Sequence, residues 1–292
     1  MRQPIVAGRF YAGSERGCRE HLERIDAADG AVEDLPPHPV AAIVPHAGWD
    51  CSGHVAMKVY RAVQAKIRPG TTFILFGAVH SFGVPRAGVY SIGSWVTPLG
   101  DLMIDSELAG LLVRQSHGLL IDDRNSHLSE HSIEVQLPMI RHIFGECLIV
   151  PIAAPPRADS HEVGRKVAEI VQQARRSVFV VGTTDLTHYG AMGYGFAPRG
   201  MGRTGLDWVK TDNDPRMIEL MRRLKAEDIV AEAHSHHNAC GAGAVAATVA
   251  AARQLGSPGG TLIEYTTSYD VLKDELYGDM IGDFVGYAGM VF

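Results

Sequence analysis

Three apolar segments that each end at a histidine constrain the fold of this chain more than any other feature. They are residues 71–80 (TTFILFGAVH), 40–46 (VAAIVPH) and 177–188 (SVFVVGTTDLTH). Continuous apolar runs are typical of parallel strands that are covered on both faces of a sheet, whereas half-exposed strands alternate. Because ligands of open α/β sheets bind just beyond the carboxyl ends of the strands, the histidines at these ends are expected to converge.

Amphipathic segments that follow the apolar runs predict an α/β fold. Apolar residues recur at helical spacing over residues 52–66 and 159–175. We find no internal repeat and no linker that would divide the chain. The sequence therefore predicts one three-layer α/β/α domain over residues 1–292, with a mainly parallel central sheet.

Other elements follow from the same patterns. Further helices are expected over residues 14–28, 105–115, 214–224, 226–234 and 239–255, and further strands over residues 84–94, 146–153, 261–267 and 284–292. Residues 95–101 are predicted to form a turn. Residues 125–131 lead into a helix that Pro138 is expected to kink. Residues 190–205 contain six glycines and form either a flexible lid beside the predicted site or a tolerated surface insertion.

Composition excludes several classes of function. The chain has 46% hydrophobic and 21% charged residues and a net charge of −6, which favours a folded core and gives no basic block for nucleic acid. No run approaches the length of a membrane span, and the first residues carry no leader-like apolar segment. The four cysteines form no CxxC pair. We expect a soluble cytoplasmic protein with free thiols, no nucleic-acid partner and no membrane contact.

The strand-end histidines are the main candidates for a site. A single histidine at a strand end is more often a hydrogen-bonded structural residue. Three of them, His46, His80 and His188, each lie before turn-forming residues, which favours a shared metal or catalytic site. Asp185 precedes His188 by three residues, so the two side chains could share a hydrogen bond that suits a general base or a supported ligand.

Further candidates surround these histidines. Cys240 lies where an alanine-rich helix is predicted to begin, and a helix start favours the thiolate that ligates metals. Cys240 alone would more simply be a small buried hydrophobe. Glu130 and His131 could form a layer behind the ligands, or His131 could line the wall of the site. Asp123, Asn125 and His127, which lie close to Glu130 in the sequence, are expected at the surface. His237 is a weak extra candidate.

Two common types of enzyme are excluded by missing motifs. The sequence contains no G-x-S-x-G elbow for a serine hydrolase. It also contains neither a P-loop nor a G-x-G-x-x-G that opens a helix after a strand.

Several motifs together resemble the Memo-like family, also called protein B of the AmmeMemoRadiSam system. They span nearly the whole chain and comprise RFYAGS (9–14), VPHAGW with a following SG (44–53), GAVH (77–80), TPLGDLMID (97–105), EHSIEVQLP (130–138), GTTDLTHYG (182–190) and NACG (238–241). This family is similar in fold to the class III extradiol dioxygenases, which use non-haem iron. Trp49 stands where the family usually has tyrosine.

The resemblance implies specific roles. The family's metal ligands fall on His46, His80 and Cys240, and the dioxygenase base falls on His188, with Asp185 beside it. A cysteine thus takes the place of the carboxylate of a two-histidine, one-carboxylate triad, and the softer thiolate suits Fe²⁺, copper or zinc. Iron is the first expectation.

Two classes of function stay open from the sequence. The first is a metal-dependent oxidoreductase, similar to a dioxygenase, in which His188 moves protons. The second is a non-catalytic redox or signalling module that binds metal or peptide in the same pocket. Either would take a small molecule or a peptide as its ligand.

Overall fold

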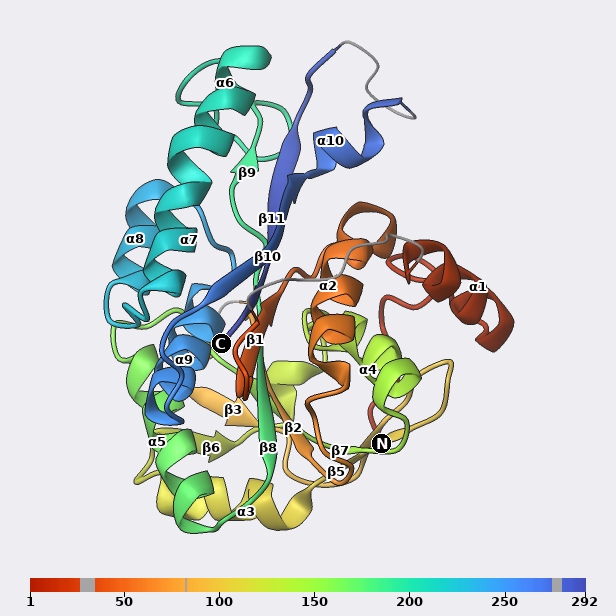
Figure 1. Ribbon diagram of the computed structural model, residues 1–292, viewed down its shortest axis with the longest axis vertical. Helices are drawn as coiled ribbons and strands as arrows, with labels where there is room; N and C mark the ends of the chain where they lie inside the picture. The colour runs from red at the N-terminus through yellow and green to blue at the C-terminus, as the bar shows by residue number, and fades with distance from the viewer. Residues whose placement is uncertain (27–34, 82, 275–279) are drawn as a thin grey trace.

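The computed structural model describes residues 1–26, 35–81, 83–274 and 280–292. A twisted sheet runs through the molecule and helices cover both of its faces (Figure 1). The three-layer α/β fold class predicted from the sequence is confirmed. Residues 27 and 28 of the first predicted helix lie outside the described residues.

The strands and helices alternate along the chain. The strands are β1 (Ala41–Val44), β2 (Thr72–Gly77), β3 (Ala87–Val89), β4 (Ser94–Trp95), β5 (Leu102–Ile104), β6 (Leu120–Asp122), β7 (Leu148–Ala153), β8 (Val178–Thr183), β9 (His188–Tyr189), β10 (Thr261–Thr267) and β11 (Phe284–Val291). The α-helices are α1 (Glu15–Asp26), α2 (Trp49–Gln64), α3 (Ser106–Gln115), α4 (Leu137–Phe144), α5 (Ser160–Gln173), α6 (Arg203–Trp208), α7 (Asp214–Arg222), α8 (Ile229–His236), α9 (Ala242–Gln254) and α10 (Ser268–Leu272).

The centre of the sheet is parallel and its margins are mixed. The strand order is β10-β11-β1-β8-β2-β7-β3-β6. The four central strands β1, β8, β2 and β7 are parallel neighbours, as the apolar runs predict. In contrast, β11 is antiparallel to β1 and β10, and β3 is antiparallel to β7. A strand that is added at a margin needs no helical crossover, so it can run in either direction.

Burial of the central strands explains their composition. Every residue of β1 and β2 is buried, because α9 packs against one face of the central strands and α2 covers the other side of β1 and β11 (Figure 1). Helix α5 packs on α9, and α1 and α4 pack on α2. A strand enclosed in this way has no solvent-facing side on which polar residues could alternate.

Several sequence predictions need correction. The helix expected after residues 125–131 begins only at Leu137, because two 3₁₀ turns (Asn125–His127 and Glu134–Gln136) precede α4. Pro138 lies in the first turn of α4, where its missing N–H costs nothing, so it introduces no kink. The turn predicted at residues 95–101 needs no correction, since residues 96–101 connect the antiparallel strands β4 and β5. The strand predicted at residues 84–94 is reduced to β3.

The glycine-rich segment is irregular from Gly190 to Gly202 and gains helical structure only at α6. An unpredicted π-helical turn (Val209–Asn213) joins α6 to α7. In the described part of the chain, no helix is long and apolar enough to cross a membrane.

Candidate metal centre

His46 occupies the centre of the candidate site. It follows β1, and its backbone N–H donates to Asp185 Oδ1 over 2.8 Å. The ring is buried, with its Nε2 3.1 Å from the Cys240 Sγ. Burial lowers the pKa of His46 to about 4, against an opposing effect of the Asp185 charge. The imidazole is therefore neutral at neutral pH, which is the form that ligates metals.

His80 reaches the same site from the end of β2 and is held by Glu130. Its backbone N–H donates to Glu130 Oε2 over 2.9 Å, and its ring Nδ1 lies 3.0 Å from the same oxygen. Burial alone would lower the pKa of His80, but the hydrogen bond and charge of Glu130 outweigh it and raise that pKa. This pairing fixes the ring orientation and leaves Nε2 available, as a carboxylate behind a metal-binding histidine does.

Glu130 is itself anchored by the backbone. Its Oε1 accepts hydrogen bonds from the N–H groups of His131 and Ser132, at 2.9 and 2.8 Å. Burial works against ionisation, yet the bonds from His80 and from the backbone hold the pKa of Glu130 well below its usual range. Glu130 is therefore a fixed negative charge, in the position behind His80 that the sequence suggested.

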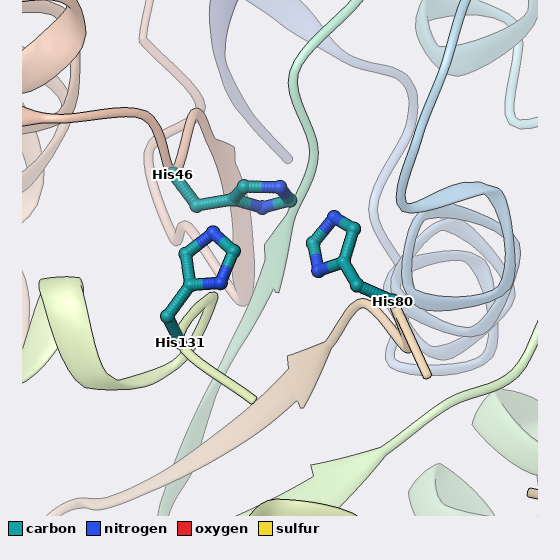
Figure 2. Close-up of side chains that lie close together, drawn as sticks. All are labelled: His46, His80 and His131. Carbon is teal, nitrogen blue, oxygen red and sulfur yellow. The ribbon is translucent and has the colours of Figure 1, made fainter. Parts of the chain in front are cut away.

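His131 lies closer to the ligands than a supporting role requires. Its ring stacks on His80 with centroids 4.9 Å apart, and its centroid is 5.7 Å from that of His46. Figure 2 shows the three imidazoles turned toward one another, and one ring nitrogen from each lies within 4.8 Å of the others. Burial lowers the pKa of His131. The three rings therefore bring nitrogen donors close together, with the pKa of His46 and His131 lowered and that of His80 raised.

Cys240 and Asp185 form the other side of the site. The Asp185 N–H lies 3.3 Å from Cys240 Sγ, and the Cys240 N–H donates to the Asp185 carbonyl over 3.2 Å. Ligand atoms of His46, Asp185 and Cys240 form a second group within 4.8 Å of one another. Burial and then the Asp185 charge raise the pKa of the Cys240 thiol. His46 is thus shared by two sets of donors.

A glycine permits the approach of Cys240. A Cβ atom on Gly241 would lie 2.2 Å from the backbone oxygen of Thr183, at the end of β8. Backbone atoms of a central strand cannot move aside cheaply, so only glycine allows this contact. The Gly241 N–H also donates to the Thr184 hydroxyl over 3.0 Å. These contacts set the distance between the start of α9 and the end of β8.

His188 lies in β9 and does not pair with Asp185. Its Nδ1 is 3.1 Å from the carbonyl oxygen of Leu186, while the Asp185 carboxylate faces His46. The expectation of an Asp185–His188 hydrogen bond is wrong, because the chain turns after β8 in a way that sends the two side chains apart. The ring of Tyr194, from the glycine-rich segment, makes an edge contact with His188 at 5.0 Å.

Two other expectations about histidines were tested by burial. His127 is fully buried, not at the surface, since its Nε2 bonds the Gly88 carbonyl over 2.9 Å. His237 is exposed and packs on Phe196, and it belongs to neither donor group found among the described residues.

Two features of the site had no signal in the sequence. Phe10, in the N-terminal segment before α1, makes an edge contact with the His131 ring, with the ring centroids 4.9 Å apart. Tyr287, in β11, lies close enough to Asp185 and Cys51 that, after burial, their charges raise its pKa. Phe10 lies in the RFYAGS motif (9–14), which does not indicate its contact with His131, and no local pattern marks Tyr287.

The sequence profile of the family described as Memo-like protein matches residues 2–291. This chain belongs to the Memo-like family. MEMO1 family proteins from Methanopyrus kandleri and Pyrococcus abyssi are 33% and 37% identical to it, over 100% of this chain and 98% and 99% of theirs. The family predicted from the sequence motifs is confirmed.

A solved structure supports the fold of this Memo-like chain. An uncharacterized protein from Escherichia coli K12 matches 85% of this chain and 99% of its own length, with a TM-score of 0.51 and 13% identity. At that identity the likeness shows a shared fold.

The donors of this Memo-like site fit a metal ion. His46 Nδ1 is buried and has no hydrogen-bond partner in the described part of the chain, which is uncommon for a buried polar atom. Imidazoles with a thiol are the donor set of zinc, copper and iron sites. A cation would also compensate the negative charge of Asp185, which opposes ionisation of the Cys240 thiol.

Proposed function

We propose that this Memo-like protein is a mononuclear metal protein whose ligands are His46, His80 and Cys240. The observation that carries the proposal is that His46 belongs to two groups of donors whose ligand atoms lie within 4.8 Å of one another. One group contains His80 and the other contains Cys240, so His46 joins them. Glu130 behind His80 supports this role, because ligating histidines usually donate their second nitrogen to an acceptor.

His131 is the candidate for a further ligand. Its ring is stacked on His80, so it could either complete the donor set or bind a ligand beside the metal. Open catalytic sites keep one position free for water or substrate. The proposal therefore assigns three protein ligands and leaves His131 to be tested separately.

The donor set narrows the choice of metal. A thiolate with imidazoles favours soft or borderline ions over Mg²⁺ or Ca²⁺. We propose Fe²⁺ first, with copper and zinc as alternatives. When bound, such an ion would supply Lewis acidity and, for iron or copper, redox chemistry.

His188 is proposed as the proton-transfer residue. The Leu186 carbonyl accepts from Nδ1, which selects the tautomer in which Nε2 is unprotonated and can take up a proton. Together these residues support a metal-dependent oxidoreductase acting on a small molecule or a peptide. The four cysteines are free, which is consistent with a cytoplasmic location.

Metal content of variants tests the ligand assignment. The protein and its His46→Ala, His80→Ala, Cys240→Ala and His131→Ala variants would be loaded with Fe²⁺ under anaerobic conditions and assayed by plasma mass spectrometry. We expect the first three to lose most of the metal. His234→Ala, at an exposed position, is the control. Full occupancy in all three ligand variants would refute the assignment.

Turnover is tested separately from binding. Anaerobically purified, iron-loaded protein would be mixed with catechols and oxygen, and ring cleavage followed by absorbance. His188→Gln should keep its metal and lose turnover, since glutamine cannot take up a proton near neutral pH. Full metal occupancy without any turnover would favour the non-catalytic module, and loss of metal in His188→Gln would make His188 a ligand.

A further inference from the structure

A cavity of about 300 Å³ opens at the carboxyl end of β7, the strand next to β2. Its lining includes the segment before β3 and β6 and the segment that joins β7 to α5. The wall residue Ala154 donates its N–H to the carbonyl of Gly77, at the end of β2, over 2.9 Å. None of the candidate metal ligands lines this cavity, so it is a separate space.

Basic side chains from separate segments line the cavity. Arg86 and His117 precede β3 and β6, and Arg157 lies between β7 and α5. The Arg86 guanidinium lies over Gly118, 3.8 Å from where a Cβ on that glycine would be. Within the described residues, the side chains of Arg86 and His117 make no hydrogen bond or ion pair.

The one acidic side chain in the lining is already engaged. Asp159 pairs with Arg157 at 3.0 Å, and both side chains are about half exposed, at 50% and 53%. Such exposed pairs are weak and are readily exchanged for another partner. Asp159 also precedes α5 without capping it through its side chain, so the first N–H groups of that helix add to the positive potential.

The lining also contains Ser160 and several apolar residues. Leu119, Pro155 and Val163 contribute to the wall. A volume of about 300 Å³ is at the lower end of the range for small-molecule sites and exceeds what an inorganic anion alone would fill. The space therefore suits a compact organic body that carries a charged head.

We propose that this cavity binds a small organic oxyanion, a phosphate ester or a carboxylate, whose charged group is held by Arg86 and His117. The planar guanidinium of Arg86 presents paired N–H donors that match two oxygens of such a group. The apolar wall contacts the body of the ligand. This proposal does not depend on the metal centre.

A second cationic cavity offers a matched control. Lys66 and Arg68 line a cavity of about 290 Å³ at the opposite edge of the sheet. It lies just after the C-terminal end of α2, where the helix dipole disfavours anions. Arg68→Gln should therefore leave oxyanion binding unchanged, although it removes the same charge from a cavity of similar size.

Backbone amide shifts of the full-length, isotope-labelled protein test the proposal. The protein would be titrated with glycerol 3-phosphate, succinate and inorganic phosphate. We expect saturable shifts around residues 117–119 and 157–161. Arg86→Gln should weaken binding by about tenfold or more, and His117→Asn, which tolerates the left-handed backbone of residue 117, should also weaken it.

The relative affinities distinguish the two ligand types. Tighter binding of glycerol 3-phosphate than of succinate assigns phosphate esters, and the reverse assigns carboxylates. The proposal is overturned if none of the three probes gives saturable shifts at these residues. It is also overturned if Arg86→Gln binds as the parent protein does, or if Arg68→Gln loses as much affinity as Arg86→Gln.

Discussion

The N-terminal segment before α1 is held by one buried carboxylate, that of Glu134. Removing this carboxylate gives the sharpest stability prediction. Glu134 accepts hydrogen bonds from Arg2 Nη1 at 2.8 Å, from the N–H groups of Ile5 and Val6 at 2.8 Å, and from the Tyr11 hydroxyl at 3.2 Å. The side chains of Arg2 and Glu134 are only 2% and 1% exposed. Replacing Glu134 by Gln therefore leaves a buried guanidinium without its counterion.

The expected loss is large. Breaking a buried ion pair by removing one partner costs about 3–5 kcal/mol, because the remaining charge is uncompensated. In Glu134→Gln, Arg2 keeps its bond to the His127 carbonyl at 2.9 Å and its position over the Trp95 ring. The expected loss of stability is therefore about 3 kcal/mol, the lower end of this range. Since single domains are stable by about 5–15 kcal/mol, this loss is a substantial fraction of the total.

Urea unfolding followed by circular dichroism would measure the difference. The matched control is Glu15→Gln, which breaks the Arg19–Glu15 pair at 2.9 Å, where the side chains are 51% and 65% exposed. That variant should change the free energy of unfolding by at most about 0.5 kcal/mol.

A double variant tests whether the loss of stability comes from the unpaired charge of Arg2. Arg2→Met combined with Glu134→Gln removes both charges and keeps a side-chain oxygen that can accept from the N–H groups of Ile5 and Val6. We expect it to recover much of the stability that Glu134→Gln loses. The reasoning is refuted if Glu134→Gln lies within about 1 kcal/mol of the parent protein, or if the double variant is less stable than the single one.

Three further predictions follow from the structure. Burial, opposed by the bond to the Gly88 carbonyl, lowers the pKa of His127 to about 4. The free energy of unfolding should therefore fall by about 3 kcal/mol as pH drops from 6.5 to 4. In urea unfolding, His127→Gln should lose less stability over this pH range than the parent protein does. Burial raises the pKa of Asp214 to about 6. The stability that protonated Asp214 contributes is therefore present below about pH 4 and lost as pH rises through 6. Asp214→Asn should remove this decline from unfolding free energies measured over a pH series, and an unchanged slope would contradict the prediction. Gly241→Ala places a Cβ 2.2 Å from the Thr183 oxygen, so it should displace Cys240 and reduce bound metal in the mass-spectrometric assay, whereas normal occupancy would show that the contact can relax.

The central strands could be predicted from the sequence because enclosure dictates their composition. A strand such as β2 is buried at every position, so it consists almost entirely of apolar residues. The first polar residue after this run marks the end of the strand. The position of His46 and His80 at one edge followed from this, since parallel strands end on the same side. The short strands β3, β5 and β6 have three residues each, too few to show a period.

Side-chain directions at the site could not be predicted. The difference between a ligand and a supporting residue at His131 depends on how its ring stacks on His80. The partner of Asp185 depends on the turn after β8, which sends the carboxylate to the backbone of His46. Contacts such as that of Arg2 with Glu134 join residues 132 positions apart, and no local pattern records them.

The position of β11 has a consequence for the order in which the protein can fold. It lies between β1 and β10 and also pairs with β9, which carries His188. One edge of β1 therefore stays unpaired until residues 284–291 have been synthesised and inserted. Such long-range pairing slows folding, and an open edge during synthesis can pair with other chains. Completion of the sheet beside β1 is accordingly expected as a late event, and nascent chains that lack β11 should depend on chaperones to stay soluble.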